Sequence, residues 1–558
     1  MEGSFGILSA MIFTPLVFAG LVALRPTREA KYVALAGTLL AAALGLVAAT
    51  QFNWTNGDTH QLASSAPWIP ALGVSLSFAA DSVSFSLILL TLLLGPICVA
   101  CSFTAISGRE RTYYAWLLVL QAAMTGVFAA RDLVVFYICF EFTLIPMFIL
   151  ISLYGSTNRK KAAIKFFLYT FTGSIIALAG LVYVAWTHAS ASGAWTFDVD
   201  TLERAARATL SRSEQAWVLL ALMLGFAVKV PLFPFHTWLP LAHTEAPTAG
   251  SVVLAGVLLK LGTYGIYRFV LPMCPLAVVD YAPLIATVSI IGILYGGLIC
   301  WVQRDVKKLV AYSSVAHLGF CILGMFALNS AGLRGSILYM INHGLSTGAL
   351  FLLIGMMYER YHTRDMRELG GLAAKMPVWA TFMVFFTMAS VGLPGLNGFV
   401  SEFMCLMGVF QASPNWASGA CTITGDATPG ATFGGVLGPI YAAVAGVGMI
   451  VAAMYLLYMV GRVVWGPLVE PHHHHHDADT PSLPPDLTPR EIAILIPLAA
   501  SCLWLGVYPK PALDALRAPV EQTLRIIHKA NGTLPAPVLD VPAEFRDAPP
   551  AGREEGTR

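Results

Sequence analysis

Long apolar runs are the feature that most restricts how this chain can fold. Roughly fourteen of them, each about 20 residues long, divide the sequence, and each is long enough to cross the ~30 Å hydrocarbon core of a bilayer. Backbone polar groups inside lipid must pair within their own segment, so these runs are expected to be helices. Charged residues make up only 11% of the chain, against about 25% in soluble domains. The sequence therefore predicts an all-α membrane protein.

The segments between the apolar runs differ in character. Residues 51–80 are expected to form a short extramembrane hairpin, 195–214 an amphipathic surface segment, and 511–558 a polar tail. The first run lacks a positively charged flank and a cleavage site, so we interpret it as a retained helix rather than a signal peptide. The expected helices cover 5–24, 31–50, 82–106, 112–130, 132–153, 162–186, 215–239, 247–270, 279–301, 306–328, 332–358, 377–412, 436–465 and 490–508.

Lysine and arginine are distributed unevenly between alternate connections. Connections that follow odd-numbered helices carry most of them, and the opposite connections carry few. Cytoplasmic loops are enriched in these residues, so both termini are predicted to lie on the periplasmic side. The rich connections hold Arg25, Arg28, Lys31, Arg109, Arg111, Arg159, Lys160, Lys161, Lys165, Arg304, Lys307, Lys308, Arg360, Arg364, Arg367, Lys375, Arg462 and Arg490, and the poor ones hold Arg131, Arg204, Arg207, Arg212, Arg268 and Arg334.

Two of the expected helices contain helix-breaking residues. The seventh contains Pro231 and Pro234, and the twelfth contains Pro394 and Gly395. Proline removes a backbone donor and clashes with the carbonyl four residues before it. Broken helices at corresponding places in two halves are typical of a transport path between inverted repeats. The alternative is a pair of kinked helices that serve packing alone.

Four ionisable residues lie deep within expected spans: Glu141, Lys229, Lys260 and Glu402. A charge near the bilayer centre costs several kcal/mol, so each needs a partner or a function. Each also has a purely structural interpretation. Glu141 and Lys229 are candidates for a structural ion pair, Lys260 for a side chain that snorkels to the interface, and Glu402 for a member of a polar loop at the break.

Histidines accompany these charges. His317 and His343 lie in neighbouring apolar helices, where a lone histidine is often a core residue, but two beside buried lysines favour a hydrated polar path. His236 and His243 flank the turn after the seventh helix and are candidates for gating residues, or simply face water.

A lysine beside a movable carboxylate suggests a proton switch. Burial disfavours the ammonium form of a lysine, whereas a nearby carboxylate favours it. If Glu141 approaches and retreats, Lys229 would bind and release a proton, and the two groups would titrate as one unit.

Motifs for cofactors and catalysis are missing. The chain has no GxGxxG, P-loop or HExxH sequence, and its nine cysteines are scattered. Cys98 and Cys101 form a CxxC within an expected helix, without a second pair, and we interpret them as small buried residues. A net charge of +2 does not indicate nucleic-acid binding. The chain therefore has the residues to move ions but needs energy from another subunit.

Three sequence stretches carry a family resemblance. They are Phe226-Ala-Val-Lys-Val-Pro-Leu-Phe-Pro-Phe-His236 with its continuation to Ser251, Phe140-Glu141 preceded by Arg131-Asp132, and Gln303-Arg-Asp-Val-Lys-Lys-Leu-Val-Ala-Tyr-Ser-Ser-Val-Ala-His317. Together they resemble the antiporter-like membrane subunits of respiratory NADH:quinone oxidoreductase, complex I, and of Mrp-type cation/proton antiporters. The resemblance extends from about residue 80 to 510. An acid at Glu402, where related subunits have a lysine, resembles the M branch, the counterpart of mitochondrial chain 4.

The resemblance implies a fold of about 14 transmembrane helices with two inverted five-helix repeats. The implied divisions are 1–110 for the first helices and hairpin, 111–270 and 278–466 for the repeats, 467–510 for a loop and the last helix, and 511–558 for the tail. It also implies a proton path in which Glu141 and Lys229 form the first half, Lys260 links the halves, His317 and His343 continue, and Glu402 is the terminal acid.

Partners and cofactors follow from the same resemblance. The chain is expected in the bacterial inner membrane, in contact with lipid and with neighbouring antiporter-like subunits L and N. NADH, FMN, iron–sulfur clusters and quinone are expected in partner subunits, and no cofactor or metal in this chain. The alternative functions are an Mrp-type antiporter subunit, a hydrogenase-linked pump subunit and a membrane scaffold without transport.

Two features depart from the family pattern. His472–His476 is a run of five histidines in an expected cytoplasmic loop, where weak metal binding and a solvated loop both remain open. The tail after about residue 512 is longer than the family pattern requires, and is expected either to contact a neighbouring subunit or to be disordered.

Overall fold

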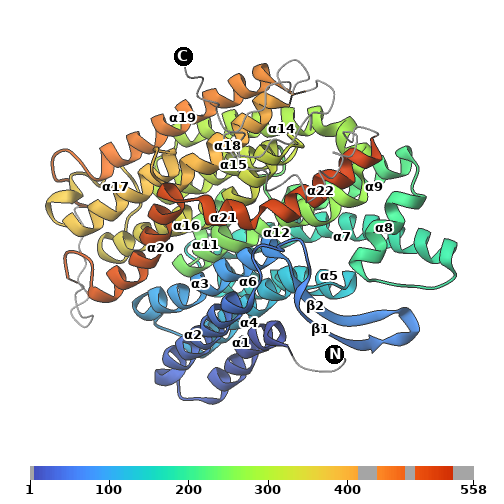
Figure 1. Cartoon of the computed structure of the whole chain (residues 1–558). Coiled ribbons are helices and arrows are strands. Elements are labelled where there is room, and N and C mark those ends of the chain that lie inside the picture. Colours follow the sequence, from blue (N-terminus) through green and yellow to red (C-terminus); the bar gives the residue numbers. More distant parts are fainter. Residues whose placement is uncertain (1–5, 413–436, 472–483, 532–558) are drawn as a thin grey trace, which may run out of the picture.

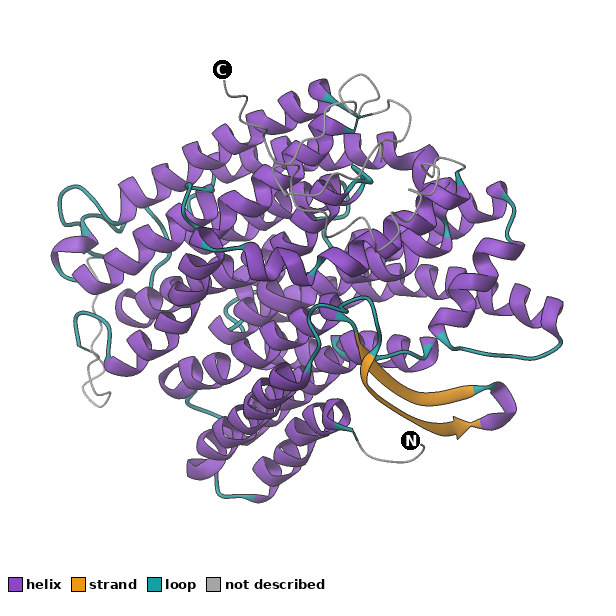
Figure 2. Ribbon diagram, viewed as in Figure 1, coloured by secondary structure: helices purple, strands orange, loops and turns teal. Residues whose placement is uncertain are grey.

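Helices form almost all of the protein, as Figures 1 and 2 show. The computed structural model describes residues 6–412, 437–471 and 484–531. Within them, 12 helices are long and apolar enough to cross a membrane. These are α1 (Ile7–Leu24), α2 (Thr27–Gln51), α3 (Ser82–Ala105), α4 (Glu110–Ala129), α5 with α6 (Leu133–Phe142 and Leu144–Tyr154), α7 (Arg159–Ser192), the segment Thr248–Met273, α14 (Pro275–Trp301), α15 (Val306–Met325), α16 (Ser330–Tyr361), α19 (Pro439–Val463) and α20 (Pro489–Val507).

The two remaining expected spans are interrupted, as the prolines and glycines predicted. The first consists of α9 (Arg212–Lys229), a turn region and α10 (Leu239–Glu245). The second consists of α17 (Pro377–Val391) and α18 (Asn397–Gln411). Between α17 and α18 the backbone passes through Gly392 and Gly395, whose φ angles of 83° and 94° favour glycine. Both predicted helix breaks are confirmed, whereas the division into inverted repeats stays a prediction.

Two further irregularities were not predicted. Thr143 separates α5 from α6 without a nearby glycine. The segment Thr248–Met273 is not one regular helix, because π-helical turns occupy Leu254–Leu258 and Ile266–Val270. The regular parts are α11 (Thr248–Val253), α12 (Leu259–Gly265) and α13 (Leu271–Met273). π turns are rare and occur mostly at functional sites.

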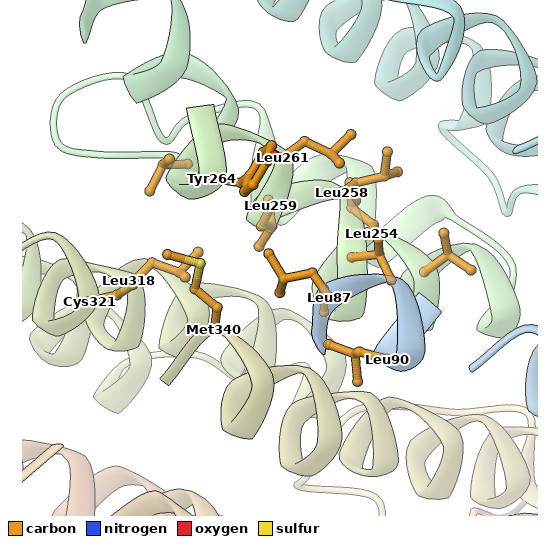
Figure 3. Close-up of a cluster of buried hydrophobic side chains, with 14 of the residues drawn as sticks. Leu87, Leu90, Leu254, Leu258, Leu259, Leu261, Tyr264, Leu318, Cys321 and Met340 are labelled. Carbon is orange, nitrogen blue, oxygen red and sulfur yellow. The ribbon is translucent and has the colours of Figure 1, made fainter. Parts of the chain in front are cut away.

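The most buried helices lie at the centre of the bundle. In Thr248–Met273, 100% of an 18-residue apolar stretch is buried inside the protein, and in α16 94% of such a stretch is buried. In α2 and α19 only 33% of the corresponding stretch is buried. Leu254, Leu258, Leu318 and Met340 belong to the apolar cluster around the two central helices (Figure 3). Polar groups on these central helices are therefore shielded by protein on all sides.

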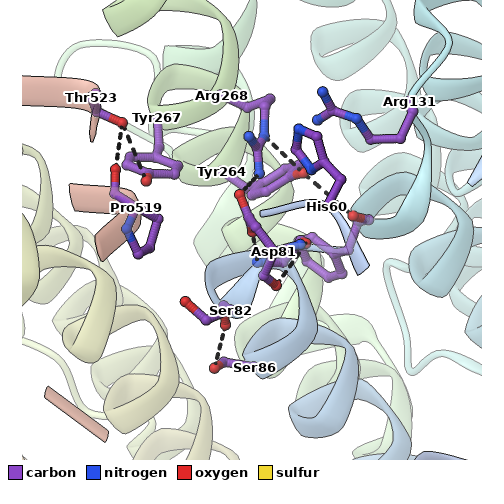
Figure 4. Close-up of polar contacts among 12 residues, drawn as sticks. His60, Asp81, Ser82, Ser86, Arg131, Tyr264, Tyr267, Arg268, Pro519 and Thr523 are labelled. Carbon is purple, nitrogen blue, oxygen red and sulfur yellow. Dashed lines mark hydrogen bonds and ion pairs between the residues drawn. The ribbon is translucent and has the colours of Figure 1, made fainter. Parts of the chain in front are cut away.

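One end of the bundle carries a polar layer built on a hairpin. Strands β1 (Gln61–Ile69) and β2 (Val74–Ala80) pair antiparallel, as expected for 51–80. Asp81 caps α3 and pairs with Arg268 (Figure 4), and Arg131 pairs with Asp200 on α8 (Val199–Thr209), the helix within the predicted amphipathic segment. All of these residues come from connections that are poor in lysine and arginine.

The opposite end holds the lysine- and arginine-rich connections. Arg360 on α16 binds Glu491 on α20 through two hydrogen bonds of 3.0 and 2.8 Å. Arg364 pairs with Asp305 at 3.3 Å, and its Nη1 donates to the carbonyl of Thr244 at 2.6 Å. The two sets of connections identified in the sequence thus form separate layers.

The expectation that residues 511–558 form a polar tail is wrong for 511–530. Lys510–Ala515 forms α21 and Arg517–Ala530 forms α22, which runs across the bundle (Figure 1). Val520, Leu524 and Ile527 recur on one face of α22 and are buried. This amphipathic period was hidden by the high proline and charge content of the region. Residues 532–558 and His472–His476 lie outside the described part of the chain.

Glu203 on α8 is an unusually placed carboxyl in the hairpin-side layer. Its side chain is 12% exposed, and Oε1 has no hydrogen-bond partner among the described residues. Burial raises the pKa of Glu203 to about 7, although Arg268 and Arg131 oppose the shift. Near neutral pH this carboxyl therefore changes charge while packed against the bundle.

Glu203→Gln is expected to raise the thermal stability of the protein at about pH 8 and to change it little at about pH 5. The unfolded carboxyl ionises near 4.5 and the folded one near 7, so folding stability present at low pH is lost as the pH rises through about 7. Thermal unfolding of both variants in detergent measures this difference. Glu29→Gln, at an exposed carboxylate, is the control, and an equal effect of Glu203→Gln at both pH values would contradict the prediction.

Candidate functional site

Lys260 lies at the centre of the bundle and has two polar partners. Its side chain is fully buried on α12, between the two π-helical turns. Nζ donates to the carbonyl of Ala255, which lies in the first π turn, and lies 2.7 Å from Nδ1 of His343 on α16. When the lysine is an ammonium, Nδ1 must accept, which places the imidazole proton on Nε2. The π turn and the histidine therefore give the Lys260 side chain polar partners that lipid cannot offer.

Glu402 lies on α18 in a second polar cluster. The carboxyl is 1% exposed, and its Oε1 accepts a hydrogen bond from the Tyr339 hydroxyl. His317 Nδ1 lies 3.2 Å from the same oxygen and 2.7 Å from the hydroxyl. Three titratable groups from α15, α16 and α18 therefore share one hydrogen-bonded cluster.

The break between α17 and α18 makes room for the Glu402 carboxyl. A Cβ atom at Gly392 would lie 2.7 Å from Oε2 of Glu402, too close for any residue but glycine. Asn397 begins α18, and its side chain donates to the carbonyl of Asn342 at 3.2 Å, while Asn342 donates to the carbonyl of Asn397 at 2.7 Å. This reciprocal pair fixes the start of α18 against α16, and so fixes the position of the acid.

A small cavity separates the Lys260 and Glu402 clusters. Its volume is about 10 Å³, which is room for about one water molecule. The Nε2 atoms of His317 and His343 and the hydroxyl of Ser390 have no hydrogen-bond partner among the described residues. The two imidazole rings lie 5.9 Å apart. The cavity is lined by His317, Tyr339, His343, Ser346, Thr347, Ala389, Ser390 and Gly398.

Lys229 is the last residue of α9, immediately before the first break. Its Nζ donates to the carbonyl of Phe140 at 3.0 Å, lies 3.5 Å from the Thr143 hydroxyl and is 3.4 Å from the centre of the Phe140 ring. The interruption between α5 and α6 at Thr143 thus supplies the polar atoms that the ammonium contacts.

Glu141 is not in contact with Lys229 in this structure. It is half-buried on α5, and neither carboxylate oxygen has a hydrogen-bond partner among the described residues. The structure therefore shows no ion pair between these two residues, although they lie close enough to interact electrostatically. They are close neighbours in separate environments, with the lysine held by backbone and ring.

Among the described residues, no hydrogen bond joins His236 or His243 to the Lys260 cluster or to the Glu402 cluster. The His236 ring stacks on Phe233 with centroids 5.9 Å apart, and its Nδ1 has no partner among the described residues. His243 is fully buried against Phe351, with centroids 4.6 Å apart, and both its ring nitrogens lack partners there. A gating role for these histidines stays a prediction.

Sequence reasoning missed several polar members of the site. Tyr339 was one, although its position one turn before His343 on the same helix was a usable signal. Lys307 was counted only as a loop charge, but it is 7% exposed and its Nζ donates to the carbonyl of Ala246 at 2.6 Å. Within the described residues no group of three or more His, Cys, Asp or Glu side chains is arranged to hold a metal ion.

Comparisons with known proteins identify the architecture. Residues 130–426 match the family described as NADH:quinone oxidoreductase/Mrp antiporter, TM. The chain is 39% identical over 539 residues to NADH-quinone oxidoreductase subunit M of Rhodobacter capsulatus, covering 95% of this chain and 98% of the relative. It is 36% identical to NADH-ubiquinone oxidoreductase chain 4 of Marchantia polymorpha, covering 93% and 97%.

Solved structures give the same result. A chain of respiratory complex I from Thermus thermophilus with bound NADH superposes with a TM-score of 0.78 and 28% identity, covering 93% of this chain and 99% of that one. The Mrp complex from Dietzia sp. DQ12-45-1b superposes with a TM-score of 0.74 at 22% identity, covering 94% of this chain and 55% of that one, which is a likeness of fold alone.

Gly392→Ala is expected to destabilise the protein more than Gly395→Ala. Both substitutions place a Cβ at a positive φ angle, which costs about 1–2 kcal/mol. At Gly395 the Cβ would meet open space, whereas at Gly392 it would also press on the Glu402 carboxyl. Thermal unfolding of the two variants in detergent is the measurement. Equal losses would show that the space at Gly392 does not hold the carboxyl in place.

Proposed function

The chain belongs to the NADH:quinone oxidoreductase/Mrp antiporter family of membrane subunits, and we propose that it translocates protons as the M-type, or chain 4, subunit of an NADH:quinone oxidoreductase. Relatives of that name align with it over nearly their full length. The acid at Glu402 is the residue by which the M branch was inferred from the sequence. The enzyme activity belongs to the complex, in which this chain would be a subunit without redox chemistry.

One observation carries the proposal: a buried row of titratable groups crosses the middle of the bundle. Lys260 and His343 form one hydrogen-bonded end, and His317, Tyr339 and Glu402 form the other. Protein interiors do not keep such groups without a compensating role, because each ionisable side chain in a membrane is costly. Within each end the groups lie at hydrogen-bond distance, as proton transfer requires, and one water molecule in the small cavity would join the two ends.

The geometry suggests how a proton would move. The Lys260 ammonium would pass a proton to Nδ1 of His343, and His343 would release its Nε2 proton toward the small cavity. A water molecule in the cavity would carry a proton to Nε2 of His317, whose Nδ1 proton would pass to Glu402, directly or through the Tyr339 hydroxyl. Each step moves one proton, and the net result is a charge displaced from α12 to α18.

Lys229 and Glu141 would form the other half of the path. In this structure Nζ of Lys229 contacts the carbonyl of Phe140 and the hydroxyl of Thr143, and among the described residues no carboxylate lies within ion-pair distance of it. Movement of Glu141 toward Lys229 would favour the ammonium again. His236, which precedes α10, and His243, in the last turn of α10, would control access to this half.

Energy would come from quinone reduction in partner subunits. We propose that NADH, FMN, iron–sulfur clusters and quinone are bound by those partners, and that antiporter-like subunits L and N are the neighbours of this chain. The protein would reside in the bacterial inner membrane. An Mrp-type antiporter role is the alternative suggested by the shared fold, but the acid at Glu402, where related subunits have a lysine, counts against it. A hydrogenase-linked pump is a further alternative, which the sequence separates poorly from the proposed role.

Glu402→Gln is expected to lower proton pumping about 10-fold or more, while Glu402→Asp retains much of it. The amide keeps the shape but cannot take up a proton, whereas aspartate only shortens the reach by a methylene. Proton uptake into vesicles and coupled quinone reduction by the purified complex are the measurements. Electron transfer from NADH to an artificial acceptor, together with subunit content, serves as the control for assembly.

Tyr339→Phe in the same assay tests whether the Tyr339 hydroxyl passes a proton to Glu402 or only holds the carboxyl in place. The ring would remain and only the hydroxyl would be lost, so intermediate pumping is expected. If the Gln and Asp variants of Glu402 assemble and pump equally well, titration at this position is not needed and the proposal fails.

Membrane orientation is proposed from the two polar layers, with the hairpin end periplasmic. In a background without accessible native cysteines, Ser65→Cys in β1 should react with an impermeant thiol reagent added to cells whose outer membrane is permeabilised and whose inner membrane is intact. Lys160→Cys at the opposite end should react only after the inner membrane is opened. Both residues are exposed, and the reverse labelling pattern would refute this orientation.

A further inference from the structure

A third carboxyl accompanies the two ion pairs of the hairpin-side layer. In this layer Arg268 pairs with Asp81, and Arg131 pairs with Asp200 (Figure 4). Glu203 lies on α8, three residues after Asp200, and belongs to neither pair. The proposed proton path does not use any of these groups.

The surroundings of Glu203 give one of its carboxyl oxygens no partner. The side chain is 12% exposed, and Oε1 has no hydrogen-bond partner among the described residues. Within those residues the guanidinium at ion-pair distance is that of Arg207, 3.9 Å from Oε2, and Nη1 of this arginine already donates to the carbonyl of Pro272 at 3.2 Å. A buried carboxylate oxygen without a donor is unfavourable, so this site favours a protonated carboxyl.

The charged groups that act on Glu203 come from three parts of the chain. Arg268 lies in the π turn Ile266–Val270, Arg131 precedes α5, and Asp200 and Arg207 lie on α8 itself. Burial raises the pKa of Glu203 to about 7, and Arg268 and Arg131 oppose the shift. The charge of Glu203 is therefore set by the arginines of this layer.

Arg268 is placed to respond to the charge of Glu203. Its Nη2 donates to Asp81, and its Nε donates to the Tyr264 hydroxyl at 3.2 Å. Among the described residues its side chain makes no further hydrogen bond, so Nη1 is left for another acceptor. A guanidinium carries five donors in a planar fork and can bind two carboxylates. An ionised Glu203 attracts Arg268, whereas a protonated Glu203 leaves it to Asp81.

Arg268 belongs to the same segment as Lys260. The two residues are eight apart in Thr248–Met273, about 12 Å along the helix at ~1.5 Å per residue. Tyr264 lies midway between them and is bonded to Arg268. A change in the partner of Arg268 would therefore act on the segment that holds Lys260.

We propose that Glu203 is a proton-binding site on the hairpin side of the protein, and that its charge decides whether Arg268 is shared with Glu203 or bound by Asp81 alone. The ligand is a proton from the aqueous phase at that side, which binds a carboxylate oxygen and removes one negative charge from the layer. The link to Lys260 extends the proposed function. Proton binding at Glu203 does not depend on that function, because it needs no pumping.

Infrared difference spectroscopy of the purified protein in detergent detects a protonated carboxyl directly, through its carbonyl stretching band. Between about pH 8 and about pH 6 the unmodified protein should gain a band that Glu203→Gln lacks, with a midpoint near pH 7. The matched control is Glu29→Gln, at an exposed carboxylate, which should leave this band unchanged.

The midpoint of this band also reports the influence of Arg268. Arg268→Gln should raise the midpoint by about 1 pH unit or more, because the guanidinium no longer favours the carboxylate of Glu203. The matched control is Arg212→Gln, at an exposed arginine that pairs with Asp280, and it should leave the midpoint where it is.

Asp81→Asn tests whether Arg268 can be shared. Asparagine still caps α3 but cannot neutralise Arg268, so an ionised Glu203 should take the place of Asp81. The midpoint should fall by about 1 pH unit or more, and the loss of thermal stability should be smaller at about pH 8, where Glu203 is ionised, than at about pH 5. Asp280→Asn, the matched control, should lose equally at both pH values.

Four results would overturn the proposal. The first is a carboxyl band that persists in Glu203→Gln, and the second is a midpoint that Arg268→Gln and Arg212→Gln shift equally or not at all. The third is an equal loss of stability of Asp81→Asn at both pH values. The fourth is an Asp81→Asn variant that does not fold at either pH, because Glu203 would then be unable to replace Asp81.

Discussion

Charge inside hydrocarbon must be compensated by the protein itself, and the arrangement of this molecule depends on that requirement. Three buried ionisable residues of the proposed path lie at or near places where the backbone departs from a regular α-helix. Lys260 is held beside a π turn, Lys229 precedes one helix break, and Glu402 follows another. A regular helix uses all of its carbonyls internally, so only an irregular one can offer them to a cation or make room for a carboxyl. In this fold the buried charged side chains and the irregular parts of the helices therefore occur together.

The surrounding helices explain why these sites persist. Thr248–Met273 and α16 lie at the centre and are almost completely enclosed by protein, so their polar groups meet neighbouring side chains and not lipid. The reciprocal bonds between Asn342 and Asn397 tie the broken helix to α16. A frame of enclosing helices thus surrounds the titratable groups of the proposed proton path and separates them from lipid.

Most of the helical architecture could be predicted from sequence because, in lipid, length and hydrophobicity decide whether a segment spans. The same applies to Pro231, Pro234, Pro394 and Gly395, whose local effects are strong. The interruption at Thr143 was missed although Pro146 was a usable signal, because a proline removes the backbone hydrogen bond to the carbonyl four residues before it, here that of Phe142. The π turn at Leu254–Leu258 contains no proline, and packing decides it. Tyr339 and Lys307 were missed because their roles come from residues distant in sequence. A switch in which Glu141 approaches and leaves Lys229 stays a prediction, and in this structure Lys229 contacts the carbonyl and the ring of Phe140.

The position of α21 and α22 has a consequence for biosynthesis. Ser82 at the start of α3 donates to the carbonyl of Ala515 at 2.6 Å, Thr523 donates to Tyr267 at 3.3 Å, and Asn531 donates to the carbonyl of Pro275 at 3.2 Å. These contacts join segments that leave the ribosome hundreds of residues apart. Helices α21 and α22 can therefore dock only after all the membrane helices that precede them have been synthesised. A chain that ended before α21 would leave Ser82, Tyr267 and Pro275 without these contacts.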